Sequence, residues 1–406
     1  MNNIVGQPVE GEDFYDREDE TSRLWEQLEQ GNHVVLLAPR RVGKTSLAIR
    51  VGAEAVQHNW RFVLVDAQRD RDELGLLANL FENLKSAGLK VPILARLTEG
   101  VAWLRRSARG RVDGFGMSLE LAGNGEEEAQ TVENLINQLF EELERSEDRV
   151  LIAVDELPVL LTELNRDDET SARLRSFLNW FRGLRLRYRK NVRWLLLGSV
   201  GLDSFVEARN LTQTINDLQT ASLGAYPEPV AIGFLQALGR DKGLTLHEDV
   251  CAAIIAEIGW PLPFFLQLVF QRIYWNLGRP PQQPTLNDVT TACEQLTRPD
   301  FYKHFEPWRG RLAEGLGPDE HRAAVAVLNA LCTAREGRTR DHLRAAVAVR
   351  FPHDDHERCA RLVATVLGQL ERDGYLLRET TEPGVSARYA FRSFLLRQYW
   401  FAREVA

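Results

Sequence analysis

The chain has 406 residues, of which 44% are hydrophobic and 27% charged, and its net charge is −8. At about 150 residues per domain, this length predicts two or three domains, each with a core of its own. The composition excludes a disulfide miniprotein and a largely disordered chain. Because the charge is negative, the chain has no general attraction for nucleic acid or anionic membranes, so any contact with DNA would be local.

Neither the first residues nor the cysteines indicate an exported protein. Residues 1–14 are acidic, where a signal peptide would be basic and then apolar. The longest apolar stretch, 260–270, is shorter than the roughly 20 residues of a membrane span. The four cysteines are scattered and form no C-x-x-C pair, so neither a disulfide framework nor a zinc ribbon is indicated. We therefore expect a cytoplasmic protein with no membrane partner.

The first half of the chain alternates short apolar runs with longer amphipathic segments. This pattern is typical of an α/β fold, a parallel sheet with helices on both faces. Four strands are predicted, at 33–38, 61–66, 150–154 and 192–198. An insertion at about 92–130 contains an alternating, glycine-bearing segment, 109–122, which predicts a β-hairpin.

The second half changes character. Residues 228–296 show helical periodicity, broken near Gly259 and by the loop G-R-P-P-Q-Q-P, and predict a small all-helical domain. Residues 316–406 predict three helices, two short strands and an aromatic tail. That order is typical of a winged helix-turn-helix domain.

A phosphate-binding loop follows the first strand. The segment A-P-R-R-V-G-K-T matches the Walker A pattern G-x-x-x-x-G-K-[ST] except at its first position, where Ala38 stands. The backbone N–H groups of such a loop converge on phosphate oxygens at a helix N-terminus. Lys44 is expected to reach the β- and γ-phosphates of ATP, and the Thr45 hydroxyl to bind Mg²⁺. The predicted nucleotide-binding residues of the loop are Pro39, Arg40, Arg41, Val42, Gly43, Lys44, Thr45 and Ser46.

The third strand ends in two carboxylates. In R-V-L-I-A-V-D-E, Asp155 is expected to hold Mg²⁺, and Glu156 to polarise the attacking water as general base. Two solvated acids at a strand end are the structural alternative. Together with the Walker A loop, the pair favours hydrolysis of ATP over passive binding.

Two further sites are predicted near the fourth strand. Ser199 follows this strand and either senses the γ-phosphate or is an ordinary turn serine. Four arginines crowd the preceding helix end: they complement the helix C-terminus, remain solvated, or provide an arginine finger to a neighbouring subunit. The four are Arg182, Arg185, Arg187 and Arg189, and Arg187 is our choice for the finger.

Together these motifs resemble prokaryotic AAA+ ATPases related to the origin-recognition-like and STAND-type P-loop NTPases. The loop A-P-R-R-V-G-K-T-S-L is similar to the form common in this group. Residues 13–20, D-F-Y-D-R-E-D-E, are similar to the F-x-G-R-E-x-E motif, with Asp16 at the glycine position. The resemblance implies that Phe14 and Arg17 lie against the nucleotide's base. From the residues alone, this segment is an acidic helix start with Asp16 as its cap.

A second segment of the resemblance lies at 259–267, G-W-P-L-P-F-F-L-Q. It is similar to the G-x-P segment with which the helical lid touches nucleotide, and it makes either Pro261 or Pro263 the nucleotide contact. From the residues alone, it is a helix break with a proline in the next first turn. The resemblance implies an ATPase core at 1–221, a lid at 222–315 and a winged helix at 316–406.

The winged helix predicts either a DNA-binding or a protein-binding module. In 354–373, Val363, Val366, Leu367 and Leu370 recur at helical spacing and predict the recognition helix, followed by wing strands at 375–378 and 387–391. The arginines expected to meet DNA phosphates are Arg358, Arg361, Arg378 and Arg388. Residues 318–406 carry 14 arginines, no lysine and 12 acidic residues, a weak charge for a DNA binder. A metal site formed by His353, His356 and Cys359 is disfavoured, because a capped helix start explains them better.

We therefore predict an ATP-binding and ATP-hydrolysing molecular switch with ATP and Mg²⁺ as cofactors. Its nucleotide state would be coupled to double-stranded DNA or to the loading of a partner, and the chain would form homo-oligomers. The alternative is a STAND-like signalling scaffold whose winged helix binds protein. The sequence holds no recognisable effector domain, so we expect the effector to be a separate protein.

Overall fold

The structure is a computed structural model that describes residues 1–89, 91–94, 118–119, 130–166, 170–198, 202–207, 209–379 and 386–405. The chain divides into two compact units. One is Asp16–Leu223, and the other combines Met1–Tyr15 with Gly224–Ala406. The helical region and the winged-helix region thus fall into one unit, together with the first residues of the chain.

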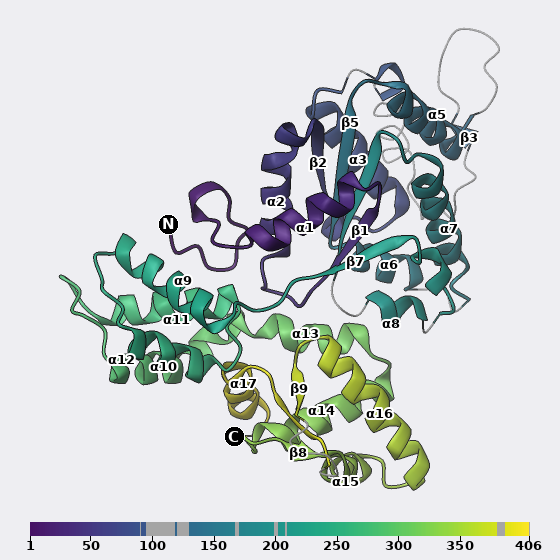
Figure 1. Ribbon diagram of the computed structural model, residues 1–406. Helices are drawn as coiled ribbons and strands as arrows, with labels where there is room; N and C mark the ends of the chain where they lie inside the picture. The colour runs from purple at the N-terminus through teal and green to yellow at the C-terminus, as the bar shows by residue number, and fades with distance from the viewer. Residues whose placement is uncertain are drawn as a thin grey trace. The chain divides into compact units, whose positions relative to one another are not determined.

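The first unit is built on a five-stranded parallel sheet (Figure 1). The strand order is β2-β5-β6-β1-β7. All four predicted strands are present, and the fifth, β7, lies at the edge beside β1. The sequence L-Q-T-A-S hides this strand because only Leu218 is buried, so no apolar run marks it. The strands are β1 (His33–Leu37), β2 (Trp60–Asp66), β5 (Arg149–Asp155), β6 (Val192–Gly198) and β7 (Leu218–Ser222).

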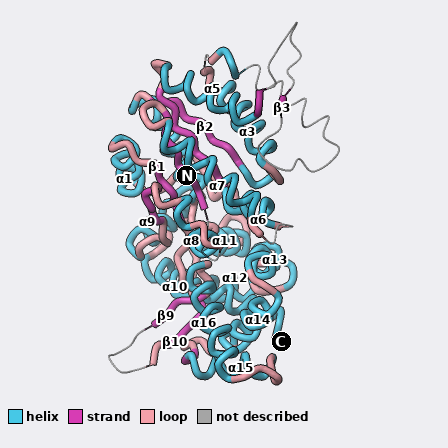
Figure 2. The backbone as a smooth tube through the Cα atoms, turned by 90° about the vertical axis from the view of Figure 1, so that its right-hand side faces the viewer, coloured by secondary structure: helices cyan, strands magenta, loops and turns pink. Residues whose placement is uncertain are grey.

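Helices cover both faces of this sheet (Figure 2). Alternate strand residues point to opposite faces: Val35 and Leu37 join the core formed with α3, α5, α6 and α7, while Val34 and Leu36 are buried on the other face. There α1 packs on β1, and α2 packs on β2 and β6. The helices are α1 (Glu18–Glu29), α2 (Lys44–Glu54), α3 (Glu73–Ser86), α5 (Val132–Arg145), α6 (Leu157–Asn165), α7 (Ala172–Arg187) and α8 (Leu202–Glu207).

The predicted hairpin in the insertion is described only in part. Ser118–Leu119 forms β3, which pairs antiparallel with β4 at Gln130–Thr131. The partner strand therefore lies beyond the predicted range 109–122, whose other residues are outside the described ranges.

The second unit begins with a group of helices. Tyr15 packs against Tyr226 and Phe234, and the Tyr226 hydroxyl donates to the backbone oxygen of Tyr15 (2.9 Å), which ties the first residues of the chain to this group. Among the described residues no single helix is long and apolar enough to cross a membrane, although α10 and α11, bent by 120°, pass that test as a pair. The helices are α9 (Glu228–Asp241), α10 (Glu248–Ile258), α11 (Pro263–Asn276), α12 (Leu286–Leu296) and α13 (Glu306–Gly315).

The last part of the chain has the predicted winged-helix order. Three helices precede a hairpin, and the short strand β8 completes a sheet of order β8-β10-β9. The predicted apolar positions of the recognition helix, Val363, Val366, Leu367 and Leu370, are all buried. The elements are α14 (Pro318–Cys332), β8 (Arg338–Thr339), α15 (Arg340–Arg350), α16 (His356–Arg372), β9 (Leu376–Glu379), β10 (Arg388–Phe391) and α17 (Phe394–Glu404).

Candidate nucleotide-binding site

The loop between β1 and α2 is wrapped around Lys44. Arg41 and Gly43 have left-handed backbones, with φ of 68° and 100°, and the chain turns at these two residues. The Lys44 ammonium donates to the backbone oxygens of Ala38 and Pro39, each at 3.1 Å. Burial lowers the pKa of Lys44, although Glu156 and Asp155 act in the opposite direction. The loop thus holds a desolvated positive charge at the N-terminus of α2, where a phosphate is favoured.

The two carboxylates of β5 have different partners. Asp155 is buried; it accepts a hydrogen bond of 2.5 Å from the Thr45 hydroxyl at Oδ2, and one of 2.8 Å from the backbone N–H of Glu156 at Oδ1. Hydroxyl and carboxylate oxygens are hard donors of the kind Mg²⁺ prefers, so Thr45 and Asp155 fit this ion. Glu156 has a left-handed backbone (φ 52°), and its Oε1 lies 4.0 Å from the guanidinium of Arg40. Such uncommon backbone angles cluster at functional sites.

The structure corrects the expected role of Asp16. Helix α1 begins at Glu18, its capping position is Arg17, and no side chain caps it. Asp16 and Arg17 are both left-handed, with φ of 58° and 76°, so the glycine at this position of the resembled motif suits the backbone. Arg17 is buried and bonds to Glu20 at 2.6 Å. Its proposed base contact stays a prediction.

Phe14 and Pro261 belong to the second unit. There the backbone oxygen of Pro261 accepts from the N–H of Tyr226 at 3.1 Å. Gly259 ends α10 with φ of 71°, and α11 begins with Pro263 at its first position. The helix break predicted from the residues is therefore present, and nucleotide contact by Pro261 stays a prediction. Ser199 lies outside the described residues.

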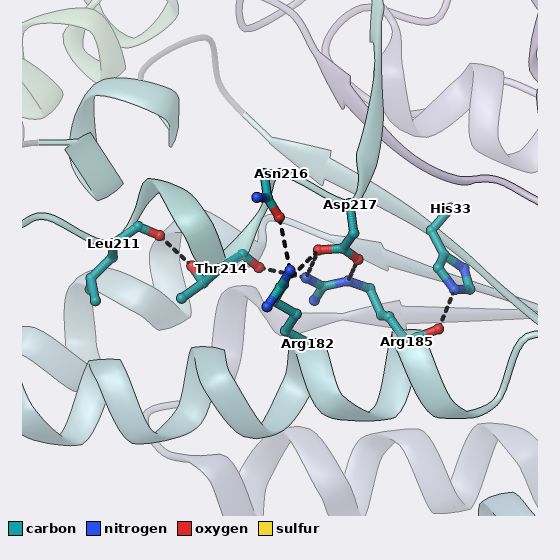
Figure 3. Close-up of polar contacts among 7 residues, drawn as sticks. All are labelled: His33, Arg182, Arg185, Leu211, Thr214, Asn216 and Asp217. Carbon is teal, nitrogen blue, oxygen red and sulfur yellow. Dashed lines mark hydrogen bonds and ion pairs between the residues drawn. The ribbon is translucent and has the colours of Figure 1, made fainter.

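The arginines at the end of α7 have separate structural roles (Figure 3). Arg185 is 0% exposed; its guanidinium bonds both oxygens of Asp217, at 2.8 and 2.9 Å, and the backbone oxygen of Thr214 at 2.6 Å. Arg182 bonds Asn216 at 3.2 Å. Because Arg185 is enclosed, it is removed from the candidates for an arginine finger. Arg187 is 63% exposed and pairs with Glu141 at 3.3 Å, so the finger role stays a prediction for it.

His33 continues this network from the start of β1. Its Nδ1 accepts from the N–H of Trp194 at 3.2 Å, so the proton is placed on Nε2, which donates to the backbone oxygen of Arg185 at 2.8 Å. Burial lowers the pKa of His33 to about 4. Neither His33 nor Asp217 was predicted as a partner of this helix end, because neither stands in a motif.

In the winged helix, three of the four arginines expected to meet DNA have partners within the chain. Arg358 pairs with Asp354 and Asp319, both at 2.7 Å, and Arg361 pairs with Glu357 at 2.6 Å. Arg388 donates to the backbone oxygens of Glu336 and Gly337. Arg378, the fourth, is exposed on β9.

The helix start at 353–359 is capped, as expected. The Asp355 side chain accepts from the N–H of Arg358 at 2.6 Å, and α16 begins at His356. Across the described ranges, no group of three or more His, Cys, Asp or Glu residues is placed to hold a metal ion.

A parallel sheet with a phosphate-binding loop after β1 and two carboxylates after β5, which β6 alone separates from β1, defines a P-loop protein. Residues 27–206 match the family model of the AAA domain. The predicted resemblance to origin-recognition-like AAA+ P-loop ATPases is confirmed in the fold. No curated protein is similar enough to count as a relative.

Solved structures extend this similarity to nearly the whole chain. The Walker-type ATPase PABY2304 of Pyrococcus abyssi is 17% identical, with a TM-score of 0.62 over 98% of this chain and 99% of that one. The ORC2 protein of Aeropyrum pernix, solved in ADPNP–ADP complexes, is 13% identical, with a TM-score of 0.59 over 99% and 95%. At these identities the likeness shows the fold alone.

Proposed function

We propose that the chain is an ATP-hydrolysing molecular switch. The observation that carries the proposal is the grouping of Lys44, Thr45, Asp155 and Glu156 at the carboxyl ends of β1 and β5, and we assign each side chain a separate task. The loop has the buried cation for phosphates, the hydroxyl–carboxylate pair suits Mg²⁺, and Glu156 is not engaged by Thr45. The nucleotide complexes of the structurally similar ORC2 protein support nucleotide as the ligand.

The chain's own residues would share the reaction as follows. The N–H groups at the start of α2 and the Lys44 ammonium bind the β- and γ-phosphates. Thr45 and Asp155 hold Mg²⁺, which when bound neutralises charge on the phosphate oxygens. Glu156 accepts the proton of the attacking water. The products are ADP and phosphate, and loss of the γ-phosphate resets the switch.

The test is ATP turnover by the wild-type chain and by Glu156→Gln. Loss of a general base should lower turnover by about 10²- to 10⁴-fold, while ATP still binds. Glu163→Gln is the matched control, because Glu163 lies on the following helix α6 and pairs with Arg166 outside the site. Unchanged hydrolysis by Glu156→Gln would show that the base lies elsewhere.

The switch's output is either DNA association or the binding of a separate protein. The contacts that Arg358, Arg361 and Arg388 make within the chain favour a protein partner. DNA phosphates would have to compete with the carboxylates and backbone oxygens that these arginines already contact. This makes the signalling scaffold the second candidate function. Homo-oligomerisation, a cytoplasmic location and the role of Ser199 complete the proposal as expectations from the sequence.

A further inference from the structure

Arg40 connects the phosphate-binding loop to the candidate base. It lies in the middle of the loop between β1 and α2, and its Nη2 is 4.0 Å from Oε1 of Glu156 at the end of β5. The two side chains are 28% and 23% exposed, so both charges are partly removed from water. Coulombic attraction is stronger there than at a fully exposed surface.

The position of Arg40 within the loop is fixed from both sides. Lys44 bonds the backbone oxygens of Ala38 and Pro39, which precede Arg40, and Arg41 follows it with a left-handed backbone. The charges of Arg40, Asp155 and Glu156 all act on the Lys44 ammonium. Arg40 and Glu156 therefore lie beside Lys44, the residue that is expected to meet the terminal phosphates.

We propose that Arg40 exchanges partners during the cycle: it holds Glu156 when no nucleotide is bound, and it binds the γ-phosphate when ATP enters. The inference rests on the proposed function and adds a specificity-determining residue to it. A guanidinium forms paired hydrogen bonds with phosphate oxygens, and a γ-phosphate carries more charge than one carboxylate, so the exchange is favourable.

The exchange links recognition of ATP to hydrolysis. When Arg40 leaves Glu156, the carboxylate is released to accept the proton of the water whose oxygen attacks the γ-phosphorus. The bond from that phosphorus to the bridging oxygen breaks, and its electron pair stays with ADP. Because ADP has no γ-phosphate, Arg40 returns to Glu156. Arg40, in the phosphate-binding loop of the same chain, would then supply the positive charge that was expected from an arginine finger.

The first test compares the dissociation constants of ADPNP and ADP, each with Mg²⁺, by calorimetric titration. Arg40→Ala should weaken ADPNP by about 10- to 100-fold, the usual loss for a hydrogen bond to a charged group, and leave ADP within about twofold. Arg40→Lys should fall between, because it retains charge without the paired geometry. Arg50→Ala is the matched control: it removes an arginine paired with Glu54 at 2.7 Å, elsewhere on α2, and should change neither constant.

Equal weakening of both nucleotides by Arg40→Ala, or no weakening, would overturn the inference. A wild-type chain that binds neither nucleotide would instead overturn the proposed function on which it rests. A second measurement tests the exchange itself. Glu156→Gln removes the competing charge, so it should tighten ADPNP by about threefold or more without tightening ADP. Unchanged ADPNP affinity in that variant would show that Glu156 does not compete for Arg40.

Discussion

Buried cations at the two ends of the parallel sheet differ in their hydrogen-bond partners. At the amino ends of the strands, Arg185 is enclosed and bonds both oxygens of Asp217 and a backbone oxygen. At the carboxyl ends, Lys44 is 8% exposed, and in the described part of the chain it bonds two backbone oxygens and no carboxylate. The first cation has an internal counterion, whereas the second is stabilised only in part. A bound phosphate would supply a counterion for Lys44. We therefore expect Arg185 to stabilise the fold and Lys44 to bind a ligand.

Removal of the counterion at the amino end should have a large effect on stability. Asp217→Asn leaves the Arg185 charge buried without its partner, which should lower the free energy of unfolding by about 3–5 kcal/mol. Asp148→Asn is the control, because its pair with Arg61 is exposed, and it should cost at most about 1 kcal/mol. Urea unfolding of the two variants checks the comparison. Equal losses would show that the Arg185 pair is no more important than a surface pair.

His33, at the amino end of the sheet, should make the free energy of unfolding depend on pH. The pKa of His33 is lowered from 6.5 to about 4 in the folded chain, so the unfolded chain binds the proton more readily between these values. Stability from this group is present above pH 6.5 and is lost as the pH falls to 4, by about 3 kcal/mol in total. His33→Gln should remove this component, and the exposed His247→Gln should not. Parallel pH profiles for wild type and His33→Gln, measured by urea unfolding, would contradict the assignment.

The sequence predicts one end of the sheet well and the other poorly. The loop around Lys44 and the pair Asp155–Glu156 are each contiguous, so their motifs are visible without any fold. The bond between Arg185 and Asp217 joins residues 32 apart, and it depends on β7, whose polar sequence gives no strand signal. The contact between Arg40 and Glu156 likewise depends on the fold, because it forms only when β6 alone separates β1 from β5 in the sheet.

Local geometry explains the remaining differences. Asp16 was expected to cap α1, but a left-handed backbone at two successive residues moves the helix start to Glu18. The apolar face of α16 was predicted correctly because helical spacing records burial directly. The partners of its arginines were not predicted, because Asp319 comes from another helix.

The smallest expected effect concerns the four arginines of the winged helix, three of which already have partners within the chain. With Arg358, Arg361 and Arg388 already paired, only Arg378 of the four would release counterions, so binding to duplex DNA should show a log–log salt slope of about −1. Four available arginines would give about −3 to −4. Fluorescence anisotropy over a salt series distinguishes these slopes. A steep slope that disappears when all four are changed to Ala would restore DNA as the partner.

The most direct test of Lys44 as the ligand-binding cation is a titration of Mg²⁺–ATP into the wild-type chain and into Lys44→Ala. We expect measurable binding by the wild type and none by the variant, and a cooperative urea transition in both proteins, which shows that the variant is folded although it lacks the two hydrogen bonds that Lys44 donates to backbone oxygens. The result that would contradict it is equal affinity for ATP in the two proteins.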